Sequence, residues 1–570
     1  MHHDMNKLLS FILISFLFSF SFSQEVLKEN LSKRKKTYWD QQKRSLYSVG
    51  SYYKNKLNTT TKKHGKWYYY SKKGHLKEKR TYFLDSLHGQ SMVYYENDSI
   101  NEESHYLMGV LDSVYKHWEN NGKLTIQGNY FLGQKVGIWR YYFPNGEKQA
   151  IEIYTPNKCF IKSMWLNDNK HTQIVKNGNG NVIEFFNSGK IKKKFTVKRG
   201  IYNGIYREYT ARGKILVIGY YNNGMKDSTW TNYYYSGEQK KISHYKNDTL
   251  TGKYFELLED GNAKVSGEYI NGEKDGFWVW NKNNGKKDIE GSFSNGKMHG
   301  TWKYWFTSGE LSYIANYSND KKSGKWKYFY RNGKKFKVCH YKEDQKTGLW
   351  KTWYENGKLL MQGYYENDKE NGVWHNYWQN GKLKNSSVFK NGKLNGRWTS
   401  LYPKGNLKLL GSYKKGLKVK KWEEWYKGGQ LKEVKNLKVI RKKSKANDVV
   451  LKGRTQKISV KHGEFKAYSS RDFQLTEEGK YKKGVKHGTW FAYYPGGRTP
   501  TVICNYKNGK LHGVYKTFDR RGRLIQRGDY AKGVKHGKMQ FFNSKGKVIK
   551  EMNYRYGRRV NMYSNKNFRP

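Results

Sequence analysis

Cysteine is scarce in this 570-residue chain, which contains only three copies of it. Cys159, Cys339 and Cys504 lie far apart in the sequence. In a linear array they would be separated by tens of ångströms, whereas a disulfide needs Cα atoms within about 7 Å. Three cysteines are also too few for a disulfide framework. We therefore expect no intramolecular disulfide.

Long hydrophobic runs are absent except near the N-terminus. There Lys7 precedes an apolar run, Leu8 to Phe22, and Ser21-Phe22-Ser23 forms a small-x-small cleavage pattern. This order is typical of a secretory signal peptide, which we place at residues 1–23. The run is shorter than the ~20 residues that cross a bilayer. We expect an exported mature chain without a transmembrane span, in the periplasm, on the cell surface or secreted.

Acidic residues are few, with 47 Asp and Glu against 110 Lys and Arg, which leaves a net charge of +63. Such a basic exported protein is expected to be attracted to anionic polymers or membrane surfaces. The alternative is that the lysines keep an extended β surface soluble and unpaired. Only 36% of residues are hydrophobic while 17% are aromatic, so nearly half of the apolar residues carry rings. This composition indicates a thin structure held together by stacked rings.

A tryptophan-centred pattern recurs every 24 residues through most of the chain. The same phase continues backwards to Val182, and an earlier block keeps the spacing from Trp67 to Trp139. A fixed period of about 20–50 residues marks a repeat architecture, in which each unit contacts only its neighbours. The residues that define the period most clearly are Trp278, Trp302, Trp326, Trp350, Trp374, Trp398 and Trp422.

Each repeat contains two aromatic-rich runs separated by turn sequences such as Asn332-Gly333 and Asn391-Gly392. Aromatic runs between such turns are typical of β-hairpins, and glycine supplies the positive φ of the turn. Tandem hairpins predict an all-β fold, an elongated, twisted, single-layer antiparallel meander of about 38 strands. The turn glycines that recur with the tryptophans are Gly285, Gly309, Gly333, Gly357 and Gly381.

Segments such as Asn391 to Tyr402 (NGKLNGRWTSLY) and His487 to Gly497 (HGTWFAYYPGG) resemble MORN repeats. They are most similar to the bacterial MORN-repeat-variant family, and the resemblance covers roughly residues 60–550. It implies a single-layer array of β-hairpins that binds or scaffolds other molecules. Some bacterial relatives are labelled antitoxins. Antitoxins act in the cytosol, whereas this sequence carries an export signal.

The spacing divides the chain into segments and interrupts the repeats twice, between Trp139 and Val182 and between Trp422 and Phe465. Each interruption is 43 residues long and is compatible with either a degenerate hairpin or a loop. The second is strongly basic, which is typical of a solvated loop or hinge, with an anion-docking site as the alternative. The segments are a signal peptide (1–23), an N-terminal cap with a partial repeat (24–60), repeats (61–155), an irregular insert (156–177), repeats (178–430), a basic insert (431–460), repeats (461–550) and a tail (551–570).

No motif indicates catalysis, a cofactor or a metal site. Histidines such as His64, His462 and His487 precede the first glycine of a repeat. One histidine per repeat cannot close a zinc site, because equivalent atoms of neighbouring repeats are about 10 Å apart. A thin sheet also lacks the concave, water-excluding site that chemistry usually needs. We expect a non-enzymatic protein with no cofactor.

Two rows of turn lysines are the candidate binding surface. Their spacing of about 10 Å is close to the Debye length in physiological salt, so the rows would act collectively on a polymer. The first row is Lys286, Lys334, Lys358 and Lys382, and the second is Lys297, Lys321, Lys369 and Lys393.

We expect an exported scaffold or binding protein that contacts an anionic envelope component, such as a polysaccharide or lipid headgroup, or a protein partner. Its contacts would run along the repeated lysine and aromatic rows. Nucleic acid is a possible partner but is not favoured, although rings flanked by lysines can stack on bases. The alternative function is an antitoxin or immunity protein that blocks one partner. The sequence leaves the oligomeric state open.

Overall fold

The computed structural model describes residues 27–55, 57–443 and 455–560, which form 46 strands and one short 3₁₀ helix, η1 (Lys28–Asn30). The signal peptide proposed for residues 1–23 lies outside the described residues. The chain divides into two compact units, Met1–Ala263 with Tyr269–Glu273 and Lys264–Glu268 with Lys274–Pro570. Strand β21 (Ala263–Ile270) lies where the units divide.

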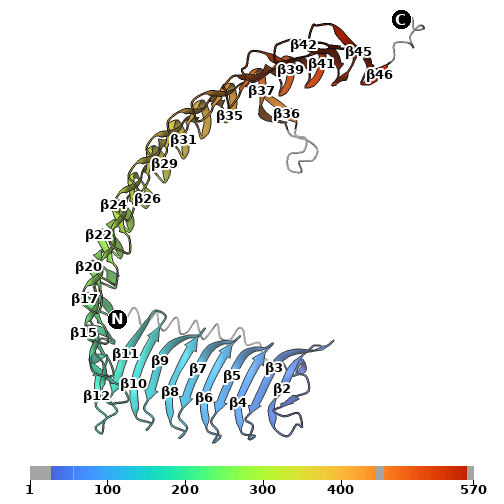
Figure 1. The fold of residues 1–570 in the computed structure, drawn as a ribbon. Coiled ribbons are helices and arrows are strands. Elements are labelled where there is room, and N and C mark those ends of the chain that lie inside the picture. The colour runs from blue at the N-terminus through green and yellow to red at the C-terminus, as the bar shows by residue number, and fades with distance from the viewer. Residues whose placement is uncertain (1–26, 56, 444–454, 561–570) are drawn as a thin grey trace, which may run out of the picture. The chain divides into compact units, whose positions relative to one another are not determined.

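In the first unit, successive strands of the sequence pair antiparallel, from β1 with β2 to β18 with the divided strand β19–β20 (Figure 1). Its strands are β1 (Lys35–Tyr38), β2 (Leu46–Lys54), β3 (Thr59–Tyr70), β4 (Leu76–Phe83), β5 (Ser86–Tyr94), β6 (Ile100–Leu107), β7 (Val110–Trp118), β8 (Leu124–Phe131), β9 (Gln134–Tyr142), β10 (Lys148–Thr155), β11 (Lys158–Trp165), β12 (Gln173–Lys176), β13 (Asn179–Phe185), β14 (Ile191–Lys198), β15 (Ile201–Tyr209), β16 (Ile215–Asn222), β17 (Met225–Tyr233), β18 (Gln239–Lys246), β19 (Thr249–Leu250) and β20 (Gly252–Leu257).

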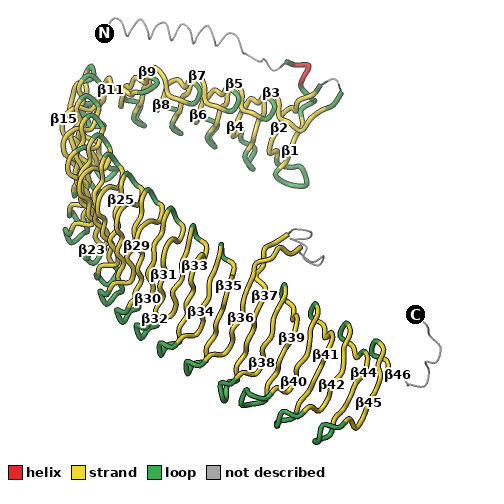
Figure 2. Tube along the Cα trace, turned by 90° about the horizontal axis from the view of Figure 1, so that it is seen from above, coloured by secondary structure: helices red, strands yellow, loops and turns green. Residues whose placement is uncertain are grey.

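The second unit is a meander of the same kind, from β22 paired with β23 to β45 paired with β46 (Figure 2). Its strands are β22 (Glu273–Asn281), β23 (Lys287–Ser294), β24 (Lys297–Trp305), β25 (Leu311–Ser318), β26 (Lys321–Lys322), β27 (Gly324–Phe329), β28 (Lys335–Lys342), β29 (Gln345–Trp353), β30 (Leu359–Glu366), β31 (Lys369–Tyr377), β32 (Leu383–Lys390), β33 (Lys393–Leu401), β34 (Leu407–Lys414), β35 (Leu417–Trp425), β36 (Leu431–Lys443), β37 (Thr455–Tyr468), β38 (Leu475–Lys482), β39 (Val485–Tyr493), β40 (Pro500–Lys507), β41 (Lys510–Phe518), β42 (Leu524–Ala531), β43 (Val534–Lys535), β44 (Gly537–Phe542), β45 (Val548–Arg555) and β46 (Arg558–Val560).

The all-β hairpin meander predicted from the sequence is confirmed within each unit. The structure has 46 strands where the sequence analysis counted about 38. Five of the additional strands are β1, β2, β11, β12 and β46, and the other three arise because β19–β20, β26–β27 and β43–β44 are each one strand divided in two. The two-residue turns have the expected geometry, since Asn391 and Gly392 both have positive φ, at 51° and 74°.

One face of each unit carries the tryptophans, whose rings lie flat on the backbone of the preceding strand. A Cβ added to Gly291 of β23 would come within 2.1 Å of the ring of Trp302. The indole N–H of Trp302 donates to the carbonyl of Ser292 at 3.1 Å, where the register of β23 against β24 shifts. Trp302 is only 3% exposed although the sheet has a single layer.

We call the tryptophan that recurs every 24 residues, or the residue in its place, the anchor of its repeat. The residue beneath the anchor ring, eleven positions earlier in the sequence, is small in most repeats. Where it is not glycine it is usually another small residue, namely Ser104, Ser243, Ala315, Cys339, Ser387 or Cys504, whereas Arg80 and Phe195 take this place before Ser91 and Tyr206. Ala315 and Cys339 are fully buried. Two cysteines of the chain are therefore small residues beneath anchor rings. The glycines in this position are Gly128, Gly219, Gly267, Gly291, Gly363, Gly411, Gly479 and Gly528.

The two 43-residue intervals have different structures. The first contains β11 and β12, within residues 156–177 that the sequence analysis treats as an irregular insert. Ser163 takes the anchor place 24 residues after Trp139 and is buried. The second interval contains one hairpin, β36–β37, whose strands of 13 and 14 residues are longer than the usual eight or nine.

Substitution of Gly291 by alanine tests the contact between ring and backbone. The new Cβ forces the indole of Trp302 away from the strand, which we expect to cost about 1–3 kcal/mol locally. Hydrogen exchange of the amides of β23 and β24 should then accelerate by roughly fivefold or more. The control is Ser292→Ala, the next residue, which lies on the opposite face. Equal exchange in wild type and Gly291→Ala would contradict the proposed contact.

Candidate binding surfaces

The two predicted lysine rows lie on opposite edges of the second unit. Lys286, Lys334, Lys358 and Lys382 follow the anchor strands and lie in the turns of one edge, whereas Lys297, Lys321, Lys369 and Lys393 begin the next anchor strands at the other edge. Turns of an antiparallel meander alternate between its two edges, which separates the rows. All eight lysines are exposed.

Lysines of the first row also connect successive turns. The ammonium of Lys286 donates to the carbonyl of Ser308 at 2.7 Å, that of Lys358 to Asn380 at 2.9 Å, and that of Lys382 to Lys404 at 2.7 Å. Each of these lysines therefore bridges to the next repeat while its charge remains at the surface. No equivalent bond is found for the second row among the described residues, so its charges are the freer of the two sets.

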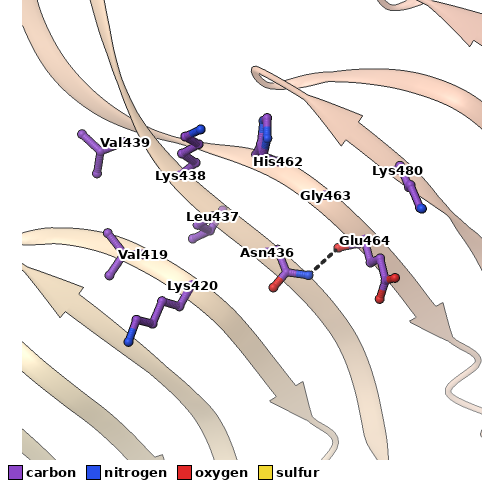
Figure 3. A pocket seen from close by; sticks show the side chains of 10 residues that line it. All are labelled: Val419, Lys420, Asn436, Leu437, Lys438, Val439, His462, Gly463, Glu464 and Lys480. Atoms are coloured by element: carbon purple, nitrogen blue, oxygen red, sulfur yellow. Dashed lines mark hydrogen bonds between the residues drawn. The ribbon is translucent and has the colours of Figure 1, made fainter.

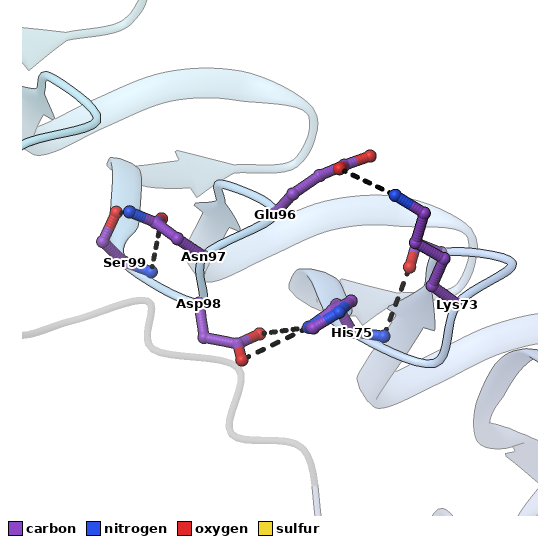
Figure 4. A network of polar contacts seen from close by, with 7 residues as sticks. Lys73, His75, Glu96, Asn97, Asp98 and Ser99 are labelled. Carbon is purple, nitrogen blue, oxygen red and sulfur yellow. Dashed lines mark hydrogen bonds and ion pairs between the residues drawn. The ribbon is translucent and has the colours of Figure 1, made fainter.

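Turns of neighbouring repeats form similar polar contacts in the first unit (Figure 4). Lys73 pairs with Glu96 at 3.4 Å, and Nδ1 of His75 lies 3.3 Å from the carboxylate of Asp98. Both pairs are exposed, so each contributes little to stability. The edges are thus continuous polar ladders with an excess of positive charge.

A third row of lysines, which the sequence analysis missed, lies over the aromatic face. Each member stands four residues before an anchor ring, with its ammonium 3.9–5.5 Å from the ring centroid. A cation in this position is attracted by the ring quadrupole. A lysine four residues before each of these anchors was the sequence signal that could have revealed this row. The row is Lys63, Lys135, Lys226, Lys274, Lys322, Lys346, Lys418, Lys461 and Lys486.

The tyrosines of the aromatic face are neutral hydrogen-bonding groups. Burial raises the pKa of Tyr221, Tyr341 and Tyr506 to about 12, so their phenols stay protonated at physiological pH. This face combines lysine ammoniums, buried rings and neutral phenols.

Histidines at the turn edge act as hydrogen-bond acceptors between repeats. Nδ1 of His64 accepts the backbone N–H of Leu84 at 3.3 Å, and Nδ1 of His462 accepts that of Lys483 at 3.3 Å. Asn179 and Asn395 occupy the equivalent place in their repeats, and their side-chain oxygens accept the backbone N–H of Arg199 and Lys415 in the same way. No cluster of three or more metal-ligating side chains occurs in the part of the chain that the structure describes.

An open depression lies where the long hairpin β36–β37 leaves the sheet (Figure 3). Lys420, Lys438 and Lys480 contribute positive charge to it, and Glu464 is its one carboxylate. The side-chain amide of Asn436 donates to the backbone carbonyl of Glu464 at 3.3 Å across the hairpin. The depression is therefore a cationic patch at the base of a projecting element.

Comparison with known proteins identifies repeated matches along the chain. Nine segments match the family described as MORN repeat variant: residues 63–83, 87–107, 135–155, 202–223, 298–319, 322–343, 346–367, 394–415 and 535–556. No curated protein matches the chain.

Two similar solved structures are a TcdB2-TccC3 crystal structure without its hypervariable C-terminal region and a TcdB2-TccC3-TEV crystal structure. Both are 10% identical to this chain, with TM-scores of 0.13 and 0.12. The alignments cover 92% and 89% of this chain but only 30% and 31% of those chains. At such TM-scores the likeness supports no inference. No helix long and apolar enough to cross a bilayer occurs in residues 27–55, 57–443 and 455–560.

Protonation of His64 should loosen the contact between its repeat and the next. Burial lowers the pKa of His64 below its ordinary value of 6.5, since the charged form is poorly solvated. The unfolded state then binds more protons than the folded state, so the stabilisation is full above about pH 6.5 and is lost as the pH falls through the folded pKa. Exchange of the Leu84 amide, corrected for its intrinsic rate, should accelerate on acidification.

The matched control for this prediction is His64→Asn, which retains an acceptor but does not titrate. Its Leu84 amide should exchange at a pH-independent corrected rate between pH 5 and 7.5. The same acid-induced increase in both proteins would show that His64 is not the responsible group.

Proposed function

Because this chain is a MORN repeat protein, a repeat scaffold or binding protein, we propose that it is exported and holds an anionic polysaccharide of the cell envelope against its lysine rows. The observation that carries this proposal is the regular array of exposed lysines on the turn edges. Equivalent charges of neighbouring repeats are about 10 Å apart, two strand spacings. A polymer with regularly spaced carboxylates could contact many of them at once.

The mechanism is multivalent electrostatic attraction. Single exposed ion pairs contribute little, but a linked chain of anions binds successive lysines as intramolecular events. The net charge of +63 adds long-range attraction before contact. The N-terminal pattern of residues 1–23 supports export of the protein to the compartment that contains such polymers.

The second lysine row is the part of this surface best suited to a test. In contrast to Lys286, Lys358 and Lys382, these lysines donate no hydrogen bond to a following turn in the described residues. Their replacement therefore changes charge with little effect on the fold. The variant replaces Lys297, Lys321, Lys369 and Lys393 by glutamine, and the control replaces the same four by arginine.

Titration with polygalacturonate, with neutral dextran as the reference, should show binding to the acidic polymer alone. Affinity should fall steeply between 50 and 200 mM salt, because binding releases condensed counterions. The glutamine variant should bind at least about tenfold more weakly at low salt, while the arginine variant keeps the wild-type affinity. Salt-insensitive binding, or equal affinity of the two variants, would contradict the proposal.

A further inference from the structure

The β36–β37 hairpin extends beyond its neighbours as a two-stranded arm, defined here as residues 438–443 and 455–460. Its pairs run from Lys438 with Val460 to Lys443 with Thr455. The neighbouring strands end their pairing at Leu437 on the β36 side and at Gly463 on the β37 side. Figures 1 and 2 show the arm projecting from the sheet.

The arm replaces an ordinary turn of the repeat. In the preceding hairpin, Lys414 pairs with Leu417 across the two-residue turn Lys415-Gly416. Lys438 and Val460 occupy the equivalent places in the long hairpin. Residues 439–459 therefore replace a two-residue turn. This insertion accounts for the 19 residues by which the 43-residue interval from Trp422 to Phe465 exceeds the normal repeat of 24.

Both edges of the arm expose backbone groups without a partner strand in the described residues. A two-stranded hairpin is marginally stable in water, and an open edge is a template for another strand. The β-branched residues Val439, Ile440, Ile458 and Val460 favour the extended conformation that such pairing requires. The described residues of the arm therefore present open edges of a kind to which another strand can add.

The charges of the arm determine which strand it can accept. Lys438, Arg441, Lys442 and Lys457 are exposed, and no carboxylate occurs among the described arm residues. Lys461, which follows the arm on β37, lies over the ring of Phe465 at 4.2 Å. Pairing with a second copy of the arm would place like charges opposite each other, which is destabilising.

We propose that the arm docks an extended acidic segment of a partner protein, which adds as a third strand along the outer edge of β36. Three of the four exposed cations, Lys438, Arg441 and Lys442, belong to this strand. Backbone hydrogen bonds supply the affinity, and the alternating carboxylates of the segment select this edge. This partner is additional to the polysaccharide, so the chain joins a protein to the polymer.

A fluorescent peptide of five Glu-Val repeats is the probe, titrated into the full mature chain by fluorescence anisotropy. Its matched control carries an N-methyl group on every backbone nitrogen, which leaves the charge intact and removes the donors from both edges of the peptide. We expect the methylated peptide to bind at least tenfold more weakly. Equal affinity would reduce the contact to charge attraction and overturn the inference.

Two protein variants locate the site. In the first, Asn-Gly replaces residues 439–459, which restores the ordinary hairpin and leaves the neighbouring repeats in register. In the second, Lys438, Arg441 and Lys442 become glutamine while the arm remains. Both should lose at least tenfold in peptide affinity but keep polygalacturonate binding. Unchanged peptide affinity in the first variant, which lacks the arm, would overturn the inference. The proposed function is tested separately, by the polygalacturonate binding of the variant with glutamine at Lys297, Lys321, Lys369 and Lys393.

A duplex oligonucleotide and a second copy of the chain are the competing occupants. Competition by the duplex at equal charge, or dimerisation in sedimentation that the armless variant loses, would assign the arm to those partners instead. We expect neither, because strand addition needs a polypeptide backbone and the arm repels its own charge.

Discussion

The fold depends on one contact, an aromatic ring laid flat over the backbone of the preceding strand. Gly291 under Trp302 is its clearest instance, since an added Cβ would meet the ring at 2.1 Å. The ring covers backbone that in a two-layer protein a second sheet would cover. In this way a single layer can bury tryptophan side chains to a few per cent exposure. The residue beneath the ring must be small, which explains why Ala315 and Cys339 occupy that place in the following repeats.

The same layer accommodates an unusual excess of lysine. Every side chain of a one-layer sheet lies near water, so a charge of +63 need not be buried. Some lysines contribute to the fold, as Lys286 does by bonding the next turn and Lys486 by lying 3.9 Å from the centroid of Trp490. Others, such as Lys369, remain at the edge and are available to ligands. The lysines therefore divide into those that contribute to the fold and those that are left for the proposed binding.

Much of this arrangement could be predicted from the sequence. The 24-residue period and pairs such as Asn391-Gly392 indicated the hairpins and their turns. The glycine under the ring was missed because glycine is also a turn signal and because Ala, Ser and Cys replace it. The separation of the lysine rows onto two edges follows from the alternation of turns and could have been predicted from the sequence. The two 43-residue intervals differ in charge but not in length. Spacing alone therefore could not show that the first contains the extra strands β11 and β12 and the second the lengthened pair β36 and β37.

Hydrogen exchange along the whole mature chain is the measurement that tests the ring-over-backbone account most directly. If each repeat is held by its own anchor, protection should rise and fall with a 24-residue period through both units, with maxima at the anchor strands and the strands beneath them. Protection should weaken in the arm, which has no flanking strand among the described residues. A single protected block without this period would show that one shared core, and not a chain of local contacts, holds the protein together.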